Sequence, residues 1–135
     1  MMGRRQQLEW LMEYQLRLAT RYRFFVSLIL VAPRDKKVNV NRLLEETLRD
    51  CDLLFDLQER SAILMSHTGV EEACKAVERY QSLCNGKIDL RFGLASFPDD
   101  ARAVANMLET AEGCLAEAQR GGRGTLVHNA KNVHS

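Results

Sequence analysis

The sequence has few of the features that mark membrane, nucleic-acid or metal-binding proteins. Its longest apolar run, residues 24–32, is broken by Ser27 and is far shorter than the roughly 20 residues that a helix needs to cross a bilayer. The formal net charge is only +1, which provides no general attraction to nucleic acid or to a membrane surface. The four cysteines form no C-x-x-C pair, and no histidine lies near them at metal-ligand spacing. We therefore expect no membrane insertion, no nucleic-acid partner, no metal and no cofactor.

The cysteines instead fall on apolar positions, where a free thiol acts as a small buried hydrophobic group. They are Cys51, Cys74, Cys84 and Cys114. Unpaired cysteines are typical of a reducing compartment, and the charged, amphipathic first residues do not resemble a signal peptide. These observations predict a cytoplasmic protein. The 135 residues, 46% hydrophobic and 27% charged, have the size and composition of one globular domain.

Hydrophobic periodicity predicts four helices and five strands. Apolar residues spaced three and four apart indicate helices, whereas the continuous run at 24–32 indicates a central strand covered on both faces. Asn41, Thr68 (in a capping box) and Asp99 or Asp100 are the expected helix N-caps. The predicted helices cover residues 4–22, 42–48, 69–84 and about 101–120, and the predicted strands cover 24–32, 52–57, 60–66, 88–97 and 125–127.

This order of elements, α-β-α-β-β-α-β-α-β, predicts an α/β (α+β) fold. Its inner β-α-β-β-α-β segment is the ferredoxin-like arrangement, in which helices cover a mixed central sheet. We expect a single domain over residues 1–130, followed by a frayed tail at 131–135.

Four segments, taken in order along the chain, carry a family resemblance. They are residues 19–22 leading into 27–31, the Arg49-Asp50-Cys51-Asp52 step, residues 92–98, and residues 118–124. Together they resemble the first helix and strand, the R-x-x-D step, the S-I-G-x-A strand and the A-K-x-x-G-R-N segment of GGDEF domains, the fold of diguanylate cyclases. The resemblance runs from Arg4 to about Asn129 and implies a GGDEF/nucleotide-cyclase-like fold in bacterial signalling.

The same resemblance implies that the cyclase site has been lost. Ala32 and Arg34 stand where the family has the D-x-D that binds Mg²⁺, and neither can hold a hard cation. The glycine-glycine-acid-acid-phenylalanine signature is replaced by residues 57–61, of which only Glu59 could ligate metal. Side chains in place of paired glycines obstruct the approach of backbone amides to a triphosphate. Gln119 replaces a phosphate-binding lysine, and no guanine-reading F-K-x-x-N-D segment is recognisable. We therefore expect no enzymatic activity.

The R-x-x-D step is the part of the resemblance that is retained. In the family it binds the product, cyclic di-GMP, away from the active site, and its counterparts here are Arg49 and Asp52, with Arg79 as a possible third contact. Arginine can grip the O6 and N7 atoms of guanine, and an ionised aspartate accepts from its N1–H and N2–H₂ groups. The simpler alternative is that Arg49 lies at a helix end, favoured by the helix dipole, and pairs with Asp52.

Two functions from different classes follow from these patterns. The first is a non-catalytic receptor for cyclic di-GMP that acts by ligand-dependent assembly. The second is a protein-interaction or dimerisation module without a nucleotide, whose contact is the Trp10 and Tyr14 face of the first helix or the hairpin. The simpler alternative is that this helix packs on the sheet inside the domain. A third alternative, GTP binding without turnover, is disfavoured because the guanine and metal features are missing.

Overall fold

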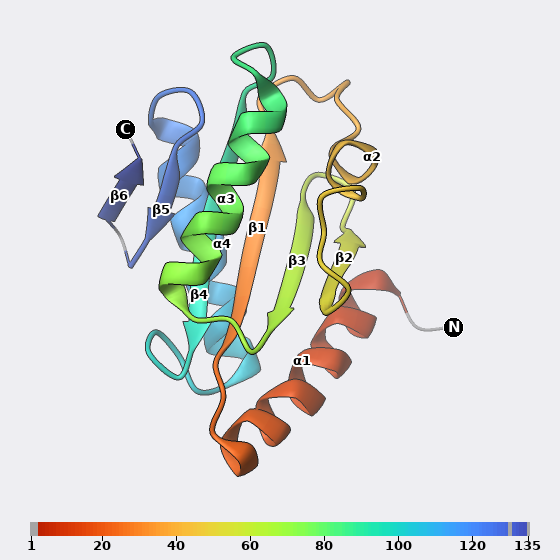
Figure 1. Ribbon diagram of the computed structural model, residues 1–135, viewed down its shortest axis with the longest axis vertical. Coiled ribbons are helices and arrows are strands. Elements are labelled where there is room, and N and C mark those ends of the chain that lie inside the picture. Colours follow the sequence, from red (N-terminus) through yellow and green to blue (C-terminus); the bar gives the residue numbers. More distant parts are fainter. Residues whose placement is uncertain (1–2, 130, 135) are drawn as a thin grey trace.

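The computed structural model describes residues 3–129 and 131–134, and all nine predicted elements are present (Figure 1). In chain order the elements are α1 (Arg4–Tyr22), β1 (Val26–Pro33), α2 (Val40–Leu44), β2 (Asp52–Asp56), β3 (Ser61–Ser66), α3 (Val70–Cys84), β4 (Leu90–Phe97), α4 (Val104–Arg120), β5 (Leu126–His128) and β6 (Lys131–His134).

The last of these elements corrects a prediction. Residues 131–134 form β6, antiparallel to β5, where the sequence predicted a frayed tail. Without residues 131–134, β5 would be an edge strand with unpaired backbone groups. Pairing with β6 supplies hydrogen bonds to that edge, which explains the extra strand. Ser135 lies outside the described residues.

The described strands form one mixed sheet in the order β2-β3-β1-β4-β5-β6. Neighbouring strands are antiparallel except for β4 and β5, which are parallel. β1 lies between β3 and β4, and its residues 26–32 are all buried. This position confirms the prediction of a central strand, because a strand covered on both faces carries apolar side chains without alternation.

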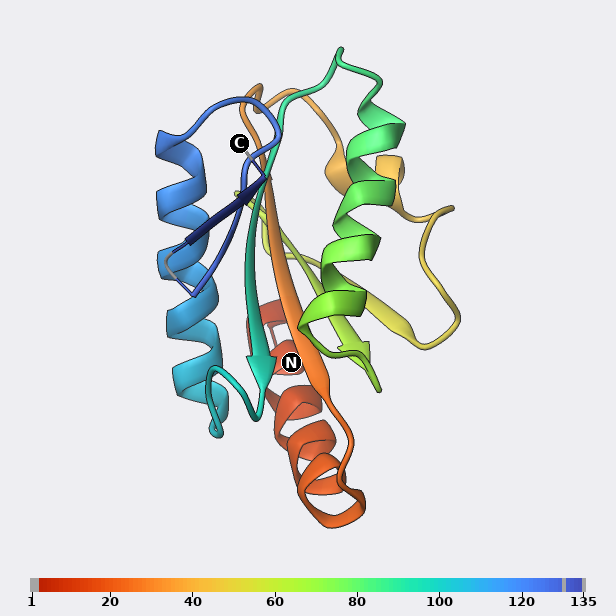
Figure 2. The same ribbon diagram turned by 60° about the vertical axis from the view of Figure 1, so that its left-hand side comes forward.

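Two helical layers cover the sheet. α1 and α4 pack on one face, and α2 and α3 pack on the other (Figures 1 and 2). Side chains of β1 alternate between the layers, so that Leu28 and Leu30 join the α1/α4 core while Ile29 and Val31 join the α2/α3 core. Each face of the sheet therefore has its own hydrophobic core. Burying one side chain of this size stabilises the fold by about 1.5–3 kcal/mol.

Gly93 sets how closely α4 lies on the sheet. It stands in the middle of β4, opposite Leu30 of β1 and Val127 of β5. A Cβ atom added there would lie 2.4 Å from the backbone nitrogen of Leu115 and 2.5 Å from the carbonyl oxygen of Ala111. The backbones of α4 and β4 can therefore approach this closely only because residue 93 has no side chain.

Helix starts were predicted less well than helix bodies. Asn39, not Asn41, caps α2, since its Oδ1 accepts from the Arg42 backbone N–H at 3.1 Å, and α2 ends at Leu44 instead of 48. Gly69, not Thr68, precedes α3. α4 starts after Ala103, and neither of these two residues provides a side-chain cap.

Asp100, which was expected to cap α4, is used elsewhere. Its Oδ2 accepts from the Ser96 backbone N–H at 2.8 Å and lies 2.7 Å from Nε2 of His128. The carboxylate thus closes the turn after β4 and links it to β5. The prediction for the cysteines was also wrong at one position: Cys84 and Cys114 are buried and Cys74 is half-buried, but Cys51 is exposed.

Candidate functional site

Arg49 and Asp52 meet where β2 begins, at the end of the β2–β3 hairpin that is distant from its turn. Asp52 is paired in register with Met65, next to the last residue of β3. Its side chain is fully buried, and its Oδ2 accepts from the Arg49 backbone N–H at 3.1 Å and lies 3.6 Å from Arg49 Nε. Arg49 is not at a helix end, as the sequence suggested, because α2 already ends at Leu44. A turn positions it instead.

Thr68 completes this contact, although the sequence pointed to it only as a helix cap. Arg49 Nη2 donates to Thr68 Oγ1 at 2.9 Å, and that hydroxyl in turn donates to the Ser66 carbonyl oxygen at 2.8 Å. The guanidinium is thereby held between Asp52 and Thr68, while 42% of the Arg49 side chain stays exposed. The simple pairing that the sequence left as an alternative is present, and one side of the guanidinium remains accessible.

Arg79 and the Arg49–Asp52 pair have a neighbour in common, the buried Tyr80. Arg79 is exposed on α3, and its guanidinium carbon lies 5.9 Å from the centre of the Tyr80 ring. Burial and the charge of Asp52 raise the pKa of Tyr80 to about 12, and the charges of Arg79 and Arg49 act in the opposite direction. The three predicted residues therefore lie within electrostatic reach of one buried phenol, although the direct contacts join only Arg49 and Asp52.

The Tyr80 hydroxyl is also unusual because it is buried without a hydrogen bond to the described residues. The side chain is fully buried, and among the described residues its oxygen has no hydrogen-bond partner. A buried hydroxyl left unpaired costs about 1–3 kcal/mol. No pattern in the sequence pointed to this group, because Tyr80 occupies an ordinary core position of α3.

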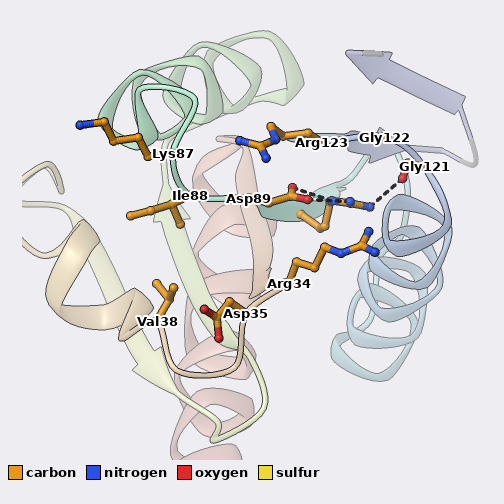
Figure 3. Close-up of a pocket in the computed structure, with 10 residues that line it drawn as sticks. Arg34, Asp35, Val38, Lys87, Ile88, Asp89, Gly121, Gly122 and Arg123 are labelled. Carbon is orange, nitrogen blue, oxygen red and sulfur yellow. Dashed lines mark hydrogen bonds and ion pairs between the residues drawn. The ribbon is translucent and has the colours of Figure 1, made fainter.

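The opposite end of the hairpin holds the positions that the resemblance assigned to a lost active site. A cavity of about 650 Å³ there is lined by Ala32, Pro33, the turn residues Gln58 and Glu59, and Gln119, among others. The structure therefore brings these sequence-predicted positions together, except Arg34, which lines a different cavity (Figure 3).

The turn carries side chains at the positions where paired glycines would leave the backbone amides accessible. Gln58 adopts a φ of 77°, a conformation that favours glycine, and its N–H donates to Asp56 Oδ1 at 2.9 Å. Arg60 pairs with Glu112 of α4 and lies 3.8 Å from Glu59.

The residues around this turn do not fit the Mg²⁺ ions that the fold implies. The methyl group of Ala32 offers no ligand, and the nearby carboxylates, Asp56 and Glu59, are engaged by a backbone N–H and by Arg60. Within the described ranges, no cluster of three or more His, Cys, Asp or Glu side chains is placed to hold a metal.

Arg91 is 3% exposed and has a structural role. Its Nε and Nη2 donate to the two carboxylate oxygens of Asp89, each at 2.8 Å. Its Nη1 donates to carbonyl oxygens at the end of α4, including those of Ala118 at 2.9 Å and Gly121 at 2.8 Å. These bonds lower the pKa of Asp89 and raise that of Arg91. The guanidinium thus caps α4 and ties it to the start of β4.

Comparison with solved structures defines the class of fold. The architecture is that of a GGDEF domain, as the sequence resemblance implied. No protein-family model matches the sequence, and no curated protein matches it. Among the helices that the structure describes, none has the length and apolar character to cross a membrane.

Three solved structures illustrate the likeness. The isolated GGDEF domain of TpbB (YfiN) from Pseudomonas aeruginosa is 20% identical, with a TM-score of 0.81 over 90% of this chain and 86% of that one. The diguanylate cyclase SiaD of the same organism, in complex with its activator SiaC, is 17% identical, with a TM-score of 0.78 over 90% of this chain and 56% of that one. A microbial GGDEF domain studied with cyclic di-GMP is 17% identical, with a TM-score of 0.71 over 87% of each chain.

Proposed function

We propose that this chain is a non-catalytic, GGDEF-like signalling domain that binds cyclic di-GMP through Arg49, Asp52 and Arg79. The observation that carries the proposal is the contrast between the two hairpin ends. At one end an arginine and a buried aspartate are held together beside a second arginine, and at the other end the metal and phosphate ligands are missing. A neighbour of the same fold has been studied with this dinucleotide.

Binding requires an exchange of partners at Asp52. In the structure its Oδ2 faces Arg49, so the N–H groups of a guanine edge can reach the carboxylate only when the Arg49 side chain moves. Because the Asp52 side chain is fully buried and Arg49 also gives up its hydrogen bond to Thr68, the ligand has to replace both of these contacts with bonds of its own. The released guanidinium can then grip guanine or phosphate, which are ligands that suit its planar fork. Arg79, exposed on the neighbouring helix, supplies a second cation for the phosphates.

Titration calorimetry with cyclic di-GMP tests this assignment. The unmodified protein should release or absorb measurable heat at micromolar ligand, and Arg49→Ala should weaken binding by at least about tenfold, or 1.4 kcal/mol. Arg17→Ala, which removes an exposed arginine of α1, is the matched control and should bind as the unmodified protein does. Absence of heat with the unmodified protein would refute the receptor function, and equal binding by Arg49→Ala would refute the site.

The lack of catalysis is tested separately. Incubation with GTP and Mg²⁺ or Mn²⁺ should yield no cyclic dinucleotide by chromatography, because Ala32, Gln58 and Gln119 offer no metal or phosphate ligation of the kind the reaction needs. Product formed in proportion to the protein concentration would contradict this expectation.

A second candidate function rests on exposed aromatic side chains. Trp10 and Tyr14 of α1 are 61% and 47% exposed, and their rings stack with centroids 6.4 Å apart. Large exposed aromatic groups are enriched at protein interfaces, and SiaD is a neighbour that was solved with a protein partner. This face is thus a candidate contact for a second copy or another protein. Sedimentation velocity should show self-association that Trp10→Ala abolishes and that Leu83→Ala, an exposed apolar control on α3, preserves. A monomer at all concentrations would exclude the dimer.

A further inference from the structure

Phe25, the residue that precedes β1, is an exposed aromatic residue near the Arg49–Asp52 pair. Its side chain is 47% exposed, although β1 itself is buried along residues 26–32. Single exposed apolar residues are common on protein surfaces, so what matters is where this one lies. We infer that Phe25 stacks on a guanine base of cyclic di-GMP, as a binding residue outside the R-x-x-D step. This inference rests on the proposed function and extends it by one contact.

Phe25 and Arg49 are bonded to the same residue, Thr68. The Thr68 backbone N–H donates to the Phe25 carbonyl oxygen at 3.0 Å, and Thr68 Oγ1 accepts from Arg49 Nη2 at 2.9 Å. Thr68 is itself fully buried and held in place, because its hydroxyl donates to the Ser66 carbonyl oxygen and its own carbonyl oxygen accepts from Ser27 Oγ at 2.7 Å. A residue with little freedom to move therefore sets the separation between the aromatic residue and the guanidinium.

The Phe25 ring lies on the same face of the sheet as the Asp52 carboxylate. A Cβ atom added at Gly69, the residue before α3, would lie 3.6 Å from Cγ and Cδ2 of Phe25, so the ring packs near the start of α3. Asp52 is paired with Met65, which belongs to the α2/α3 core. Because directly paired residues of two antiparallel strands point to the same face, the carboxylate also lies on the α3 side of the sheet.

The spacing of the strands suits one purine base. β3 lies between β1 and β2, and neighbouring strands are about 4.8 Å apart, so β1 and β2 are separated by about 10 Å. A guanine bonded to Asp52 through its edge extends across the end of β3, which brings one of its faces within reach of the Phe25 ring. This region is also where the Arg49 guanidinium lies while it is bonded to Thr68. The base therefore takes the place that Arg49 leaves when its side chain turns to grip the guanine.

Stacking supplies a kind of contact that the R-x-x-D step lacks. Arg49 and Asp52 recognise the edges of a guanine through hydrogen bonds, which water also provides to the unbound base. An aromatic ring covers the face of the base, and such stacking is a strong contribution to nucleotide binding. The ring already exposes an apolar surface and its backbone is bonded to Thr68, so little conformational freedom is lost on binding. Phe25 thus offsets part of what the ligand has to replace when Arg49 leaves Thr68.

Titration calorimetry with cyclic di-GMP on variants of the whole chain tests the role of the ring. Phe25→Leu keeps an apolar side chain beside Gly69 but has no aromatic face, and it should weaken binding at least about fivefold. Phe25→Trp enlarges that face and should bind at least as tightly as the unmodified protein. Tyr22→Leu is the matched control and should bind normally, because Tyr22 is an exposed aromatic residue at the end of α1, the helix that covers the opposite face of the sheet.

Spectroscopy distinguishes stacking from a structural role of the side chain. In ¹³C–¹H spectra of the aromatic groups, cyclic di-GMP should move the ring protons of Phe25 upfield, because they enter the ring current of the guanine. The ring protons of Tyr22 should not move. Unchanged Phe25 resonances at saturating ligand would overturn the inference, and this measurement decides the matter even if Phe25→Leu does not fold.

The two proposals fail in different ways. If the unmodified protein gives no heat with cyclic di-GMP, the receptor function is wrong and the stacking role is lost with it. If Arg49→Ala weakens binding while Phe25→Leu binds as the unmodified protein does, the receptor function stands and only the stacking role is wrong.

Discussion

Two aspartates at the opposite ends of β2 are in very different surroundings. Asp52 is buried and accepts from the backbone of Arg49, whose guanidinium also reaches Thr68, whereas Asp56 is exposed and accepts only from the turn. The strand is five residues long, so one short element carries both a closed polar cluster and an open, solvated turn. The difference predicts that substitutions at the R-x-x-D end destabilise the fold more than substitutions at the turn end.

The largest expected effect is on stability at the R-x-x-D end. Asp52→Ala should lower the free energy of unfolding by about 1–3 kcal/mol, because it leaves the Arg49 backbone N–H without its acceptor. Asp56→Ala should cost about 0.5 kcal/mol or less, since water replaces the carboxylate at an exposed position. Urea denaturation followed by circular dichroism measures both values. Equal losses would remove the contrast between the two ends.

A pH dependence should arise from Asp89, the carboxylate paired with Arg91. Because its pKa is lower in the folded state than in the unfolded chain, its contribution to stability is present above pH of about 4 and disappears as the pH falls through the folded-state pKa. Asp89→Asn should therefore destabilise the protein by about 1–2 kcal/mol at pH 7, and the difference should vanish in strong acid. Denaturation midpoints at a series of pH values test this; a constant difference down to pH of about 2 would contradict it.

A smaller effect is expected at the turn. Gln58 holds a positive φ that is unfavourable for a residue with a side chain. Gln58→Gly should raise the free energy of unfolding by up to about 1 kcal/mol, partly offset by the greater freedom of glycine in the unfolded chain. Because the metal ligands are still missing, the same variant should not synthesise cyclic di-GMP. A loss of stability would show that the Gln58 side chain has a role of its own.

The smallest effect concerns Tyr80, whose hydroxyl has no partner among the described residues. Tyr80→Phe should change stability at pH 7 by less than about 1 kcal/mol and can stabilise the fold, because no hydrogen bond is lost. Since the folded-state pKa is about 12 and the unfolded value about 10, Tyr80 makes the protein less stable as the pH rises above 10. Tyr80→Phe should lack this part of the alkaline decline. A large loss at pH 7 would reveal a bond that the hydroxyl makes.

The sequence was most informative where interactions are local. Helix bodies and strands follow from apolar spacing, and the meeting of Arg49 and Asp52 follows from a separation of three residues. Features that depend on distant partners could not be read in this way. Asp100 bonds to Ser96 and His128 instead of capping a helix, and Arg91 is buried because the end of α4 lies over it. The type of a charged or capping residue indicates which hydrogen bonds it can make. Which of these bonds form depends on how the distant elements pack.

The missing side chain at Gly93 has a consequence for the surface as well as for the core. It fixes the depth at which α4 rests on β4, and the loop that leaves α4, residues 121–123, forms one wall of the cavity that Arg34 lines at the end of β1. A single methyl group at position 93 would lift the helix from the sheet and carry that wall outward with it. The shape of this solvent-facing cavity therefore depends on a buried residue, Gly93, whose side chain is a single hydrogen atom.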